Sequence, residues 1–332
     1  MRLQFSLLAA FAAAMTMFSA VPSAQSKLSL VHPFPDFLVY TKSCKAMVAA
    51  INAAGVGVDV KGGNEAVKMF QQPGAVSKGA VDMVCTPAAF YAAAIPENEA
   101  ISTSPSSPAI VRENGGMAII DQLHQKHFKV KYLGWIDSGP GFHIYMKDAP
   151  SFNKMGLPDF AGVKMRDNPI YGAFFRALGA TTHNMPSTAV YSALEKGIVN
   201  ASAWTSIGLI AFKWDKFLRH RIDPKFYQTD IGLIMNLKSW NKMPKAQQDI
   251  LQSTVIAHEN SSRAARLSEV AAERRKLAEG GMKFHDVPKA GEYLKVAIES
   301  AYMRMEERLT KRNRPLDSMQ KLRQLYQQSA TN

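Results

Sequence analysis

The chain has 332 residues, of which 40 are lysine or arginine and 27 are aspartate or glutamate, so its formal net charge is +13 at pH 7. This length allows two domains, and the absence of low-complexity stretches and internal repeats excludes fibrous and solenoid proteins. The basic balance favours an anionic partner, and for an exported protein we expect a small anion or an anionic membrane surface rather than nucleic acid.

The N-terminus predicts a secretory signal peptide over residues 1–26. Arg2 is the only charge before an apolar run from Leu7 to Met17, which is shorter than the roughly 20 residues of a membrane-spanning helix. Small residues follow the run, and we expect cleavage near Ser26, with Ser23 as the alternative. The sequence therefore predicts a periplasmic protein without membrane insertion after cleavage. An uncleaved membrane anchor is the competing interpretation.

Strands and helices alternate in the first part of the chain. The predicted strands are 27–31, 58–60 and 79–85, and the predicted helices are 36–54 and 65–77. Strands separated by helices are typical of βαβ units, in which the strands of one sheet run parallel.

The same alternation begins again after residue 130. Further strands are predicted at 130–135, 142–146, 162–166 and 198–204, and further helices at 170–178, 188–196, 245–279 and 291–312. Two such units predict an α/β protein of two lobes, one made of residues 27–143 plus 232–271 and the other of 144–231 plus 272–332. The proline-free stretch 245–279 is long enough to cross both lobes.

Cys44 and Cys85 are the only cysteines, and they show no metal-binding spacing. In an oxidising compartment they could form a disulfide. The alternative is that both are buried as small apolar side chains.

Common catalytic motifs are absent from the sequence. There is no Gly-x-Ser-x-Gly turn, and Ser262 stands where a zinc-protease helix beginning at His258 needs its second histidine. His124 and His127 could bind a metal with a third ligand, but two exposed histidines are the simpler interpretation. We therefore expect no enzymatic activity, no metal and no cofactor.

Residues 213–225 interleave basic side chains with Trp214 and Phe217. This pattern fits either a surface for an anionic polymer or a solvated face whose aromatic rings point inward.

Arg166 is the strongest candidate for a binding residue. It ends a predicted strand, and Asp167, Asn168 and Pro169 stop that strand and begin a helix. Ligands of open α/β sheets bind beyond the carboxyl ends of strands, and the guanidinium fork matches a carboxylate. The alternative is an ion pair with Asp167 or another acid.

Several segments share their residues and spacing with one known family. They are Asp159 to Arg166, Leu178 to Thr181, Met185-Pro186 and Val190 to Asn200, with Gly79 to Met83 and Leu133 to Trp135 upstream and Asn236 to Pro244 downstream. In these segments the chain resembles the solute-binding proteins of TRAP (tripartite ATP-independent periplasmic) transporters. The resemblance spans essentially the whole chain after the signal peptide.

The resemblance implies a periplasmic-binding-protein-like fold whose two lobes close over an organic acid, with a long helix spanning both. It implies that Arg166 binds the ligand's carboxylate and that Trp204 packs against the ligand. Tyr171, just past Arg166, and Phe90, after the third strand, are further candidates. The implied partners are a small organic anion and the membrane subunits of a TRAP permease.

Two departures from the family pattern narrow the class of ligand that we expect. Residues 199–203 lack the acid that many members carry, which argues against a bound metal ion. A second arginine of some sialic-acid-type members is absent, and Phe142 and His143 stand in its place as further candidate binding residues. We therefore expect a small or apolar monocarboxylate, of the 2-oxoacid or aromatic acid type. A ligand-sensing receptor and an exported enzyme on the same scaffold are the alternative functions.

Overall fold

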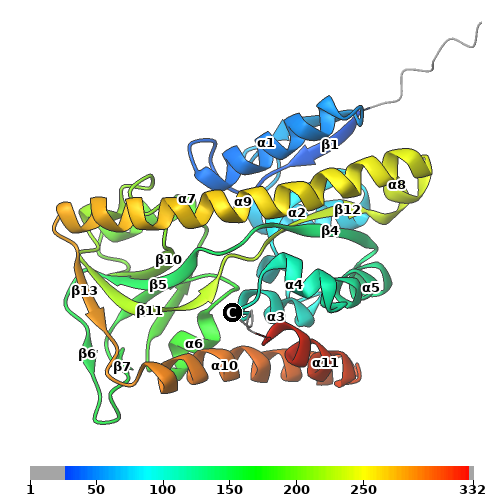
Figure 1. The fold of residues 1–332 in the computed structure, drawn as a ribbon. Coiled ribbons are helices and arrows are strands. Elements are labelled where there is room, and N and C mark those ends of the chain that lie inside the picture. Colours follow the sequence, from blue (N-terminus) through cyan, green and yellow to red (C-terminus); the bar gives the residue numbers. More distant parts are fainter. Residues whose placement is uncertain (1–26, 329–332) are drawn as a thin grey trace, which may run out of the picture.

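The computed structural model describes residues 27–328, so the predicted signal peptide lies outside the described residues. Two β-sheets stand side by side, each covered by helices, and two long helices run across both (Figure 1). We call the part around the five-stranded sheet the first lobe and the part around the six-stranded sheet the second lobe. The predicted two-lobed α/β fold is confirmed.

The sheet of the first lobe has the strand order β2-β1-β3-β12-β4. Its first three strands are parallel, and β12 runs antiparallel to both of its neighbours. The bounds are β1 Leu28–Val31, β2 Val58–Gly62, β3 Met83–Pro87, β4 Val130–Asp137 and β12 Ile231–Asn236.

The sheet of the second lobe has the order β13-β11-β5-β10-β8-β9, with β5 antiparallel to β10 and β11. Its strands are β5 Gly141–Met146, β8 Lys164–Asp167, β9 Thr181–Asn184, β10 Ala201–Thr205, β11 His220–Gln228 and β13 Lys283–Asp286. A separate hairpin pairs β6 Ser151–Phe152 with β7 Pro158–Asp159.

Two crossing segments connect the sheets, residues 138–140 between β4 and β5 and residues 229–230 between β11 and β12. Thr229 ties them together, because its backbone N–H and its hydroxyl both donate to the Pro140 carbonyl, at 2.9 and 2.7 Å. The lobes are therefore joined by two adjacent crossing segments that are hydrogen-bonded to each other, rather than by one flexible linker.

The helices cover the outer faces of both sheets. They are α1 Val39–Ala53, α2 Gln72–Lys78, α3 Glu99–Ser102, α4 Pro108–Glu113, α5 Gly116–Phe128, α6 Gly172–Ala177, α7 Ser187–Glu195, α8 Leu237–Lys242, α9 Lys245–Glu279, α10 Ala290–Thr310 and α11 Asp317–Tyr326, with 3-10 turns η1 Met69–Gln71, η2 Ala88–Tyr91, η3 Pro96–Asn98 and η4 Trp214–Lys216. None of the helices within residues 27–328 has the length and apolar character needed to cross a membrane.

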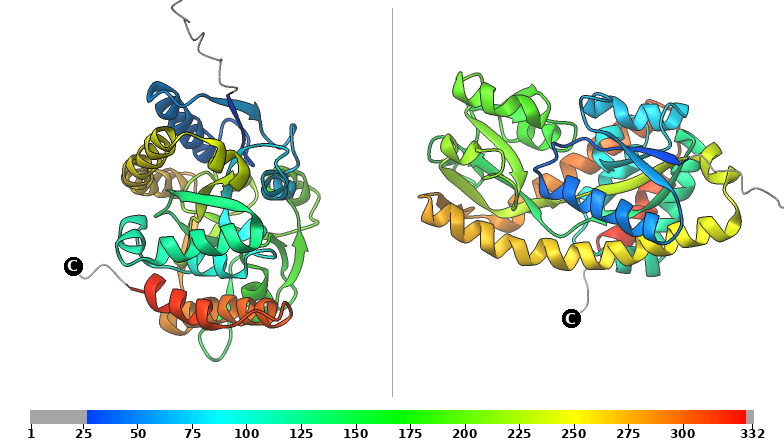
Figure 2. Two further views of the ribbon diagram at one scale, coloured as in Figure 1. Left: turned by 90° about the vertical axis from the view of Figure 1, so that its right-hand side faces the viewer. Right: turned by 90° about the horizontal axis from the view of Figure 1, so that it is seen from above.

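Helix α9 spans both lobes, as the sequence predicts (Figure 2). On the first lobe the Glu259 carboxylate accepts the backbone N–H of Trp135 at 2.7 Å. On the second lobe the Glu273 carboxylate accepts the backbone N–H of Gly208 at 2.8 Å. These contacts fix one rigid helix to both lobes.

Helix α10 crosses the molecule on the opposite side from α9 (Figure 1). Arg304 of this helix donates to the Glu99 carboxylate of the first lobe at 2.6 Å and to the Ile170 carbonyl of the second at 2.7 Å. Tyr302 and, from α11, Tyr326 are buried in the core beneath the first sheet. Helix α10 thus contacts both lobes, and α11 packs on the first. The predicted lobe boundaries stay a prediction.

Two predicted elements near the first sheet are displaced. The helix expected at 65–77 begins only at Gln72, after the 3-10 turn η1 at Met69–Gln71, and the Asn64 side chain ahead of it accepts the Met69 N–H in a turn. The strand expected at 79–85 begins at Met83, since Gly79 ends α2 in a left-handed conformation, φ +78°.

Cys44 of α1 and Cys85 of β3 form a disulfide in the first lobe, with their Cα atoms 6.3 Å apart. Of the two alternatives that the sequence leaves open, the structure has the disulfide.

Candidate ligand-binding site

A cavity of about 20 Å³ lies between the two lobes, at the carboxyl ends of strands from both sheets. This is room for about one water molecule, so the lobes are closed around it. The first lobe lines it with residues at or just after the ends of β1 and β3, and the second with residues at or just after the ends of β8 and β10. The lining side chains that matter below are Phe34, Tyr40, Phe90, Phe142, Arg166, Ile170, Ser187, Trp204, Thr205 and Asp230.

Arg166 is the one basic side chain in this lining, and its exposed fraction is 1 %. Its Nε and Nη2 donate to the Met185 carbonyl at 3.1 and 2.8 Å, and its Nη1 donates to the Tyr171 hydroxyl at 2.5 Å. Within residues 27–328 no carboxylate lies within ion-pair distance of this guanidinium. A buried charge held only by neutral acceptors is costly, and a bound anion would compensate it.

The alternative ion pair between Arg166 and its neighbour is wrong. The nearest arginine nitrogen to the Asp167 carboxylate belongs to Arg176, at 3.7 Å. Because consecutive strand residues point to opposite faces, Asp167 turns away from the face that Arg166 occupies. Burial raises the pKa of Asp167 above its ordinary value.

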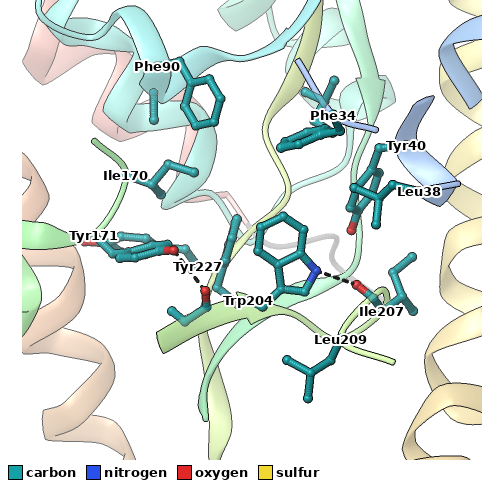
Figure 3. Close-up of a cluster of buried hydrophobic side chains, with 14 of the residues drawn as sticks. Phe34, Leu38, Tyr40, Phe90, Ile170, Tyr171, Trp204, Ile207, Leu209 and Tyr227 are labelled. Carbon is teal, nitrogen blue, oxygen red and sulfur yellow. Dashed lines mark hydrogen bonds between the residues drawn. The ribbon is translucent and has the colours of Figure 1, made fainter. Parts of the chain in front are cut away.

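Aromatic rings from both lobes form the walls of the cavity (Figure 3). The ring of Trp204 meets that of Phe34 edge to face, with centroids 5.9 Å apart, and Phe34 meets Phe90 in the same way at 6.2 Å. The indole N–H of Trp204 donates to the Ile207 carbonyl at 3.1 Å. Trp204 therefore offers the cavity its apolar surface rather than its donor.

One hydrogen bond crosses directly between the lobes beside the cavity. The Tyr40 hydroxyl of α1 donates to Thr205 Oγ1 of β10 at 2.8 Å, and both residues line the cavity. The bond joins the two lobes directly and helps to hold them in the closed arrangement of this structure.

Tyr171 and His143 are near the site but do not line the cavity. Tyr171 lies behind Arg166, and its hydroxyl donates to the Ala203 carbonyl at 2.9 Å, which orients it as an acceptor for the guanidinium. His143 is held by Asp223 at 2.8 Å and by Ser206 at 3.1 Å. Its neighbour on β5, Phe142, points into the cavity instead.

The ring of His143 is neutral in this environment. Burial, the largest influence, lowers the pKa of His143 to about 4, although Asp223 acts in the opposite direction. The hydrogen bonds fit a ring that donates from Nδ1 to Asp223 and accepts at Nε2 from Ser206. His143 thus contributes no positive charge for an anion.

His124 is not the exposed residue that the simpler interpretation expects, since its exposed fraction is 0 %. Its Nδ1 donates to the Ile120 carbonyl at 2.7 Å and its Nε2 accepts from the Tyr91 hydroxyl at 2.9 Å. Both ring nitrogens are occupied, so neither is free for a metal. Among residues 27–328 no three His, Cys, Asp or Glu side chains are grouped to hold a metal ion.

In the basic segment 213–225, Trp214 is buried while Lys213 and Lys216 are exposed. This arrangement is that of a solvated face with its aromatic ring turned inward.

A wider groove of about 830 Å³ runs between α1, α9 and residues 207–211. Its arginine, Arg266, is paired with Glu269 at 2.7 Å and lies 3.4 Å from Asp137. The charge of this arginine is already balanced by acids, so the groove lacks the feature that makes the cavity around Arg166 suited to an anion.

Sequence reasoning missed Phe34, Tyr40, Ser187 and Asp230, which line the cavity. Phe34 follows β1, so the strand-end rule that identified Arg166 would have found it. The other three reach the cavity from helix ends and from a crossing segment, and only the tertiary structure brings them there.

Two α/β lobes joined by crossing strands, with a buried arginine facing an aromatic cavity between them, define a solute-binding protein of the periplasmic type. Residues 109–308 match the family described as bacterial extracellular solute-binding protein, family 7. The chain belongs to this family, the solute-binding proteins of TRAP transporters, which are receptors and not enzymes.

Curated relatives are similar over part of their length. A monocarboxylate 2-oxoacid-binding periplasmic protein of Nostoc is 23% identical over 209 residues, which are 58% of this chain and 54% of that protein. A solute-binding protein of Verminephrobacter eiseniae is 26% identical over 135 residues, 40% of this chain and 38% of that protein. The matched region spans about half the length, or less, of these relatives.

Solved structures share the fold over nearly the whole chain. A Bordetella pertussis extracytoplasmic solute receptor binding pyroglutamic acid has a TM-score of 0.74 at 14% identity, covering 91% of this chain and 99% of that one. A Desulfovibrio salexigens TRAP protein with bound orotic acid has a TM-score of 0.76 at 13% identity, covering 90% and 98%. A Bordetella bronchiseptica TRAP protein with calcium and picolinate has a TM-score of 0.73 at 18% identity, covering 90% and 91%.

Proposed function

We propose that this protein captures a small organic acid in the periplasm and delivers it to the membrane subunits of a TRAP permease. The ligand's carboxylate binds Arg166, and the two lobes close over the rest of the molecule. Trp204, Phe90 and Phe142 pack against the ligand, while Tyr171 holds the arginine in place.

The observation that carries this proposal is the buried guanidinium of Arg166, which faces an aromatic cavity and has no acidic partner among the described residues. Its two nitrogens toward Met185 and the one toward Tyr171 leave further N–H donors for a carboxylate. The apolar walls favour a monocarboxylate with a flat or apolar body. Three of the similar proteins bind ring acids, namely pyroglutamic acid, orotic acid and picolinate, while others hold open-chain ligands such as malonate and L-galactonate.

A thermal-shift screen tests the proposal. The protein without residues 1–26 and its Arg166→Ala variant are heated with 2-oxoacids, aromatic monocarboxylates, dicarboxylates and sugar acids. We expect a monocarboxylate to raise the melting temperature of the unmutated protein alone, because only binding to the folded state stabilises it. An acid that stabilises both proteins equally would contradict the role of Arg166.

A second measurement covers the case in which the protein is already occupied by a ligand that was bound during expression. If no acid raises the melting temperature, mass spectrometry of the denatured protein shows whether an acid was carried through purification. Absence of any bound acid and of any stabilising acid would contradict the proposed function.

A further inference from the structure

Asp230 occupies the second crossing segment and lines the same cavity as Arg166. Its side chain is completely buried. The backbone carbonyl of Asp230 accepts the N–H of Ala88 at 2.9 Å, and its Oδ2 accepts the N–H of Ala89 at 2.8 Å. These bonds fix the carboxyl group at the start of the turn that carries Phe90.

The second oxygen, Oδ1, has no hydrogen-bond partner in the part of the chain that the structure describes. No basic side chain there forms an ion pair with Asp230 either. Burial raises the pKa of Asp230 to about 7, with the Glu99 carboxylate acting in the same direction. A buried acceptor without a donor costs free energy, and a ligand that brings a donor to Oδ1 would remove that cost.

We propose that Asp230 determines specificity in this site: its Oδ1 accepts a hydrogen bond from an N–H or O–H group of the ligand whose carboxylate binds Arg166. The inference rests on the proposed function and narrows it. The ligand is then an organic acid that carries a hydrogen-bond donor on its body, and hydrocarbon acids of the same shape are rejected.

The test uses two pairs of acids that differ only at the donor. Pyrrole-2-carboxylate has an N–H where furan-2-carboxylate has a ring oxygen, and pyroglutamate differs in the same way from its lactone analogue. Each acid is titrated calorimetrically at pH 8, about one unit above the pKa of Asp230, so that this carboxyl group is mostly ionised. We expect at least one N–H acid to bind about tenfold or more tightly than its oxygen counterpart, the usual effect of one hydrogen bond to a charged group.

The Asp230→Asn variant gives the sharper result. Its single side-chain oxygen is needed by the Ala89 N–H, so its amide N–H faces the position of Oδ1 and repels a donor. We expect the preference to disappear or invert, while melting of the ligand-free variant shows that it folds. Asp59→Asn, an exposed carboxylate on β2, is the matched control and should leave the preference unchanged.

Equal affinity within both pairs, a preference that Asp230→Asn does not alter, or no binding of any N–H acid would each overturn the inference. The Arg166→Ala variant shows whether only the role of Asp230 fails or the proposed function fails as well. If Arg166→Ala abolishes binding of acids that the unmutated protein does not discriminate, the proposed function stands and the role of Asp230 falls. If binding survives Arg166→Ala, the proposed function itself fails.

Discussion

Arg166 differs from the other deeply buried arginines in what surrounds it. Arg221 is 2.7 Å from the Asp223 carboxylate, and Arg266 is 2.7 Å from Glu269. Arg166 has no such acid among the described residues: it donates to the Met185 carbonyl and the Tyr171 hydroxyl, and its guanidinium lies 6.0 Å from the centre of the Trp214 ring. Arginines that stabilise the fold here are neutralised by acids of the chain, and the one at the cavity is held in place but not neutralised.

The hydroxyl of Tyr171 is therefore expected to matter more than that of another buried tyrosine. Tyr171→Phe removes the acceptor of Arg166 and the donor to Ala203, and should lower the free energy of unfolding by about 1–3 kcal/mol in urea denaturation. Tyr293→Phe is the control, because that buried hydroxyl has no partner among the described residues. A larger loss in Tyr293→Phe than in Tyr171→Phe would contradict this account.

A pH effect is expected at His124, far from the ligand. Burial lowers the pKa of His124 to about 4, below the ordinary value of about 6.5 that it has when unfolded. Since the unfolded chain binds this proton first, the contribution to stability is complete above about pH 6.5 and is lost as the pH falls. Between pH 7 and pH 5 the unmutated protein should lose about 2 kcal/mol relative to His124→Gln.

Denaturation of both proteins in urea at the two pH values measures this difference. The comparison with His124→Gln cancels the contributions of the other titrating groups, including Asp137 and Asp230, whose raised pKa values act in the opposite direction. A stability difference that is the same at pH 7 and pH 5 would show that His124 is not neutral in the folded protein.

At the scale of elements, the sequence predicts many of the segments whose apolar pattern is regular, but the apolar strand β12, Ile231–Asn236, was not predicted. The bounds of α9 agree with the prediction, 245–279, and β1, β4 and β5 lie where alternation with helices places them. Strand β11 was missed because it buries Arg221 and Asp223. These two side chains form an ion pair, with Arg221 Nη2 and Asp223 Oδ1 2.7 Å apart. The sequence shows only two charged residues there and does not show that they are paired and buried.

In the binding site, too, some residues could be predicted from the sequence and others could not. Arg166 could be predicted because it ends a strand within a segment that resembles the family, and Trp204 because its spacing from Gly197 matches that of a ligand-contacting residue in the family. The hydrogen bond between Tyr40 and Thr205 joins residues 165 positions apart. That Asp230 Oδ1 has no hydrogen-bond partner among the described residues is a consequence of the tertiary structure around it. Neither leaves a local signal in the sequence.

The disulfide between α1 and β3 is expected to stabilise the first lobe. It closes a loop of 41 residues, for which the loss of unfolded-state entropy corresponds to about 4 kcal/mol. The double variant Cys44→Ala, Cys85→Ala should unfold at lower urea, with a free energy of unfolding lower by about 2–4 kcal/mol. Dithiothreitol should destabilise the unmutated protein and leave the double variant unchanged; equal sensitivity of both would contradict the prediction.

For the whole molecule, the connections between the lobes decide how it can move. Two crossing segments, α9 and α10 all pass from one lobe to the other, and Arg304 bonds to both. We expect such a frame to let the lobes open and close without separating freely. A ligand that contacts both lobes favours the closed form by the difference between its affinities for the two forms.

The most direct test of the central claim is a calorimetric titration of the acid that gives the largest thermal shift. The unmutated protein is compared with Arg166→Lys, which keeps the charge but loses the fork, and with Arg176→Lys, whose side chain is exposed on α6. The account predicts that Arg166→Lys weakens binding about tenfold or more and that Arg176→Lys has no effect. Equal affinities in all three proteins would contradict it.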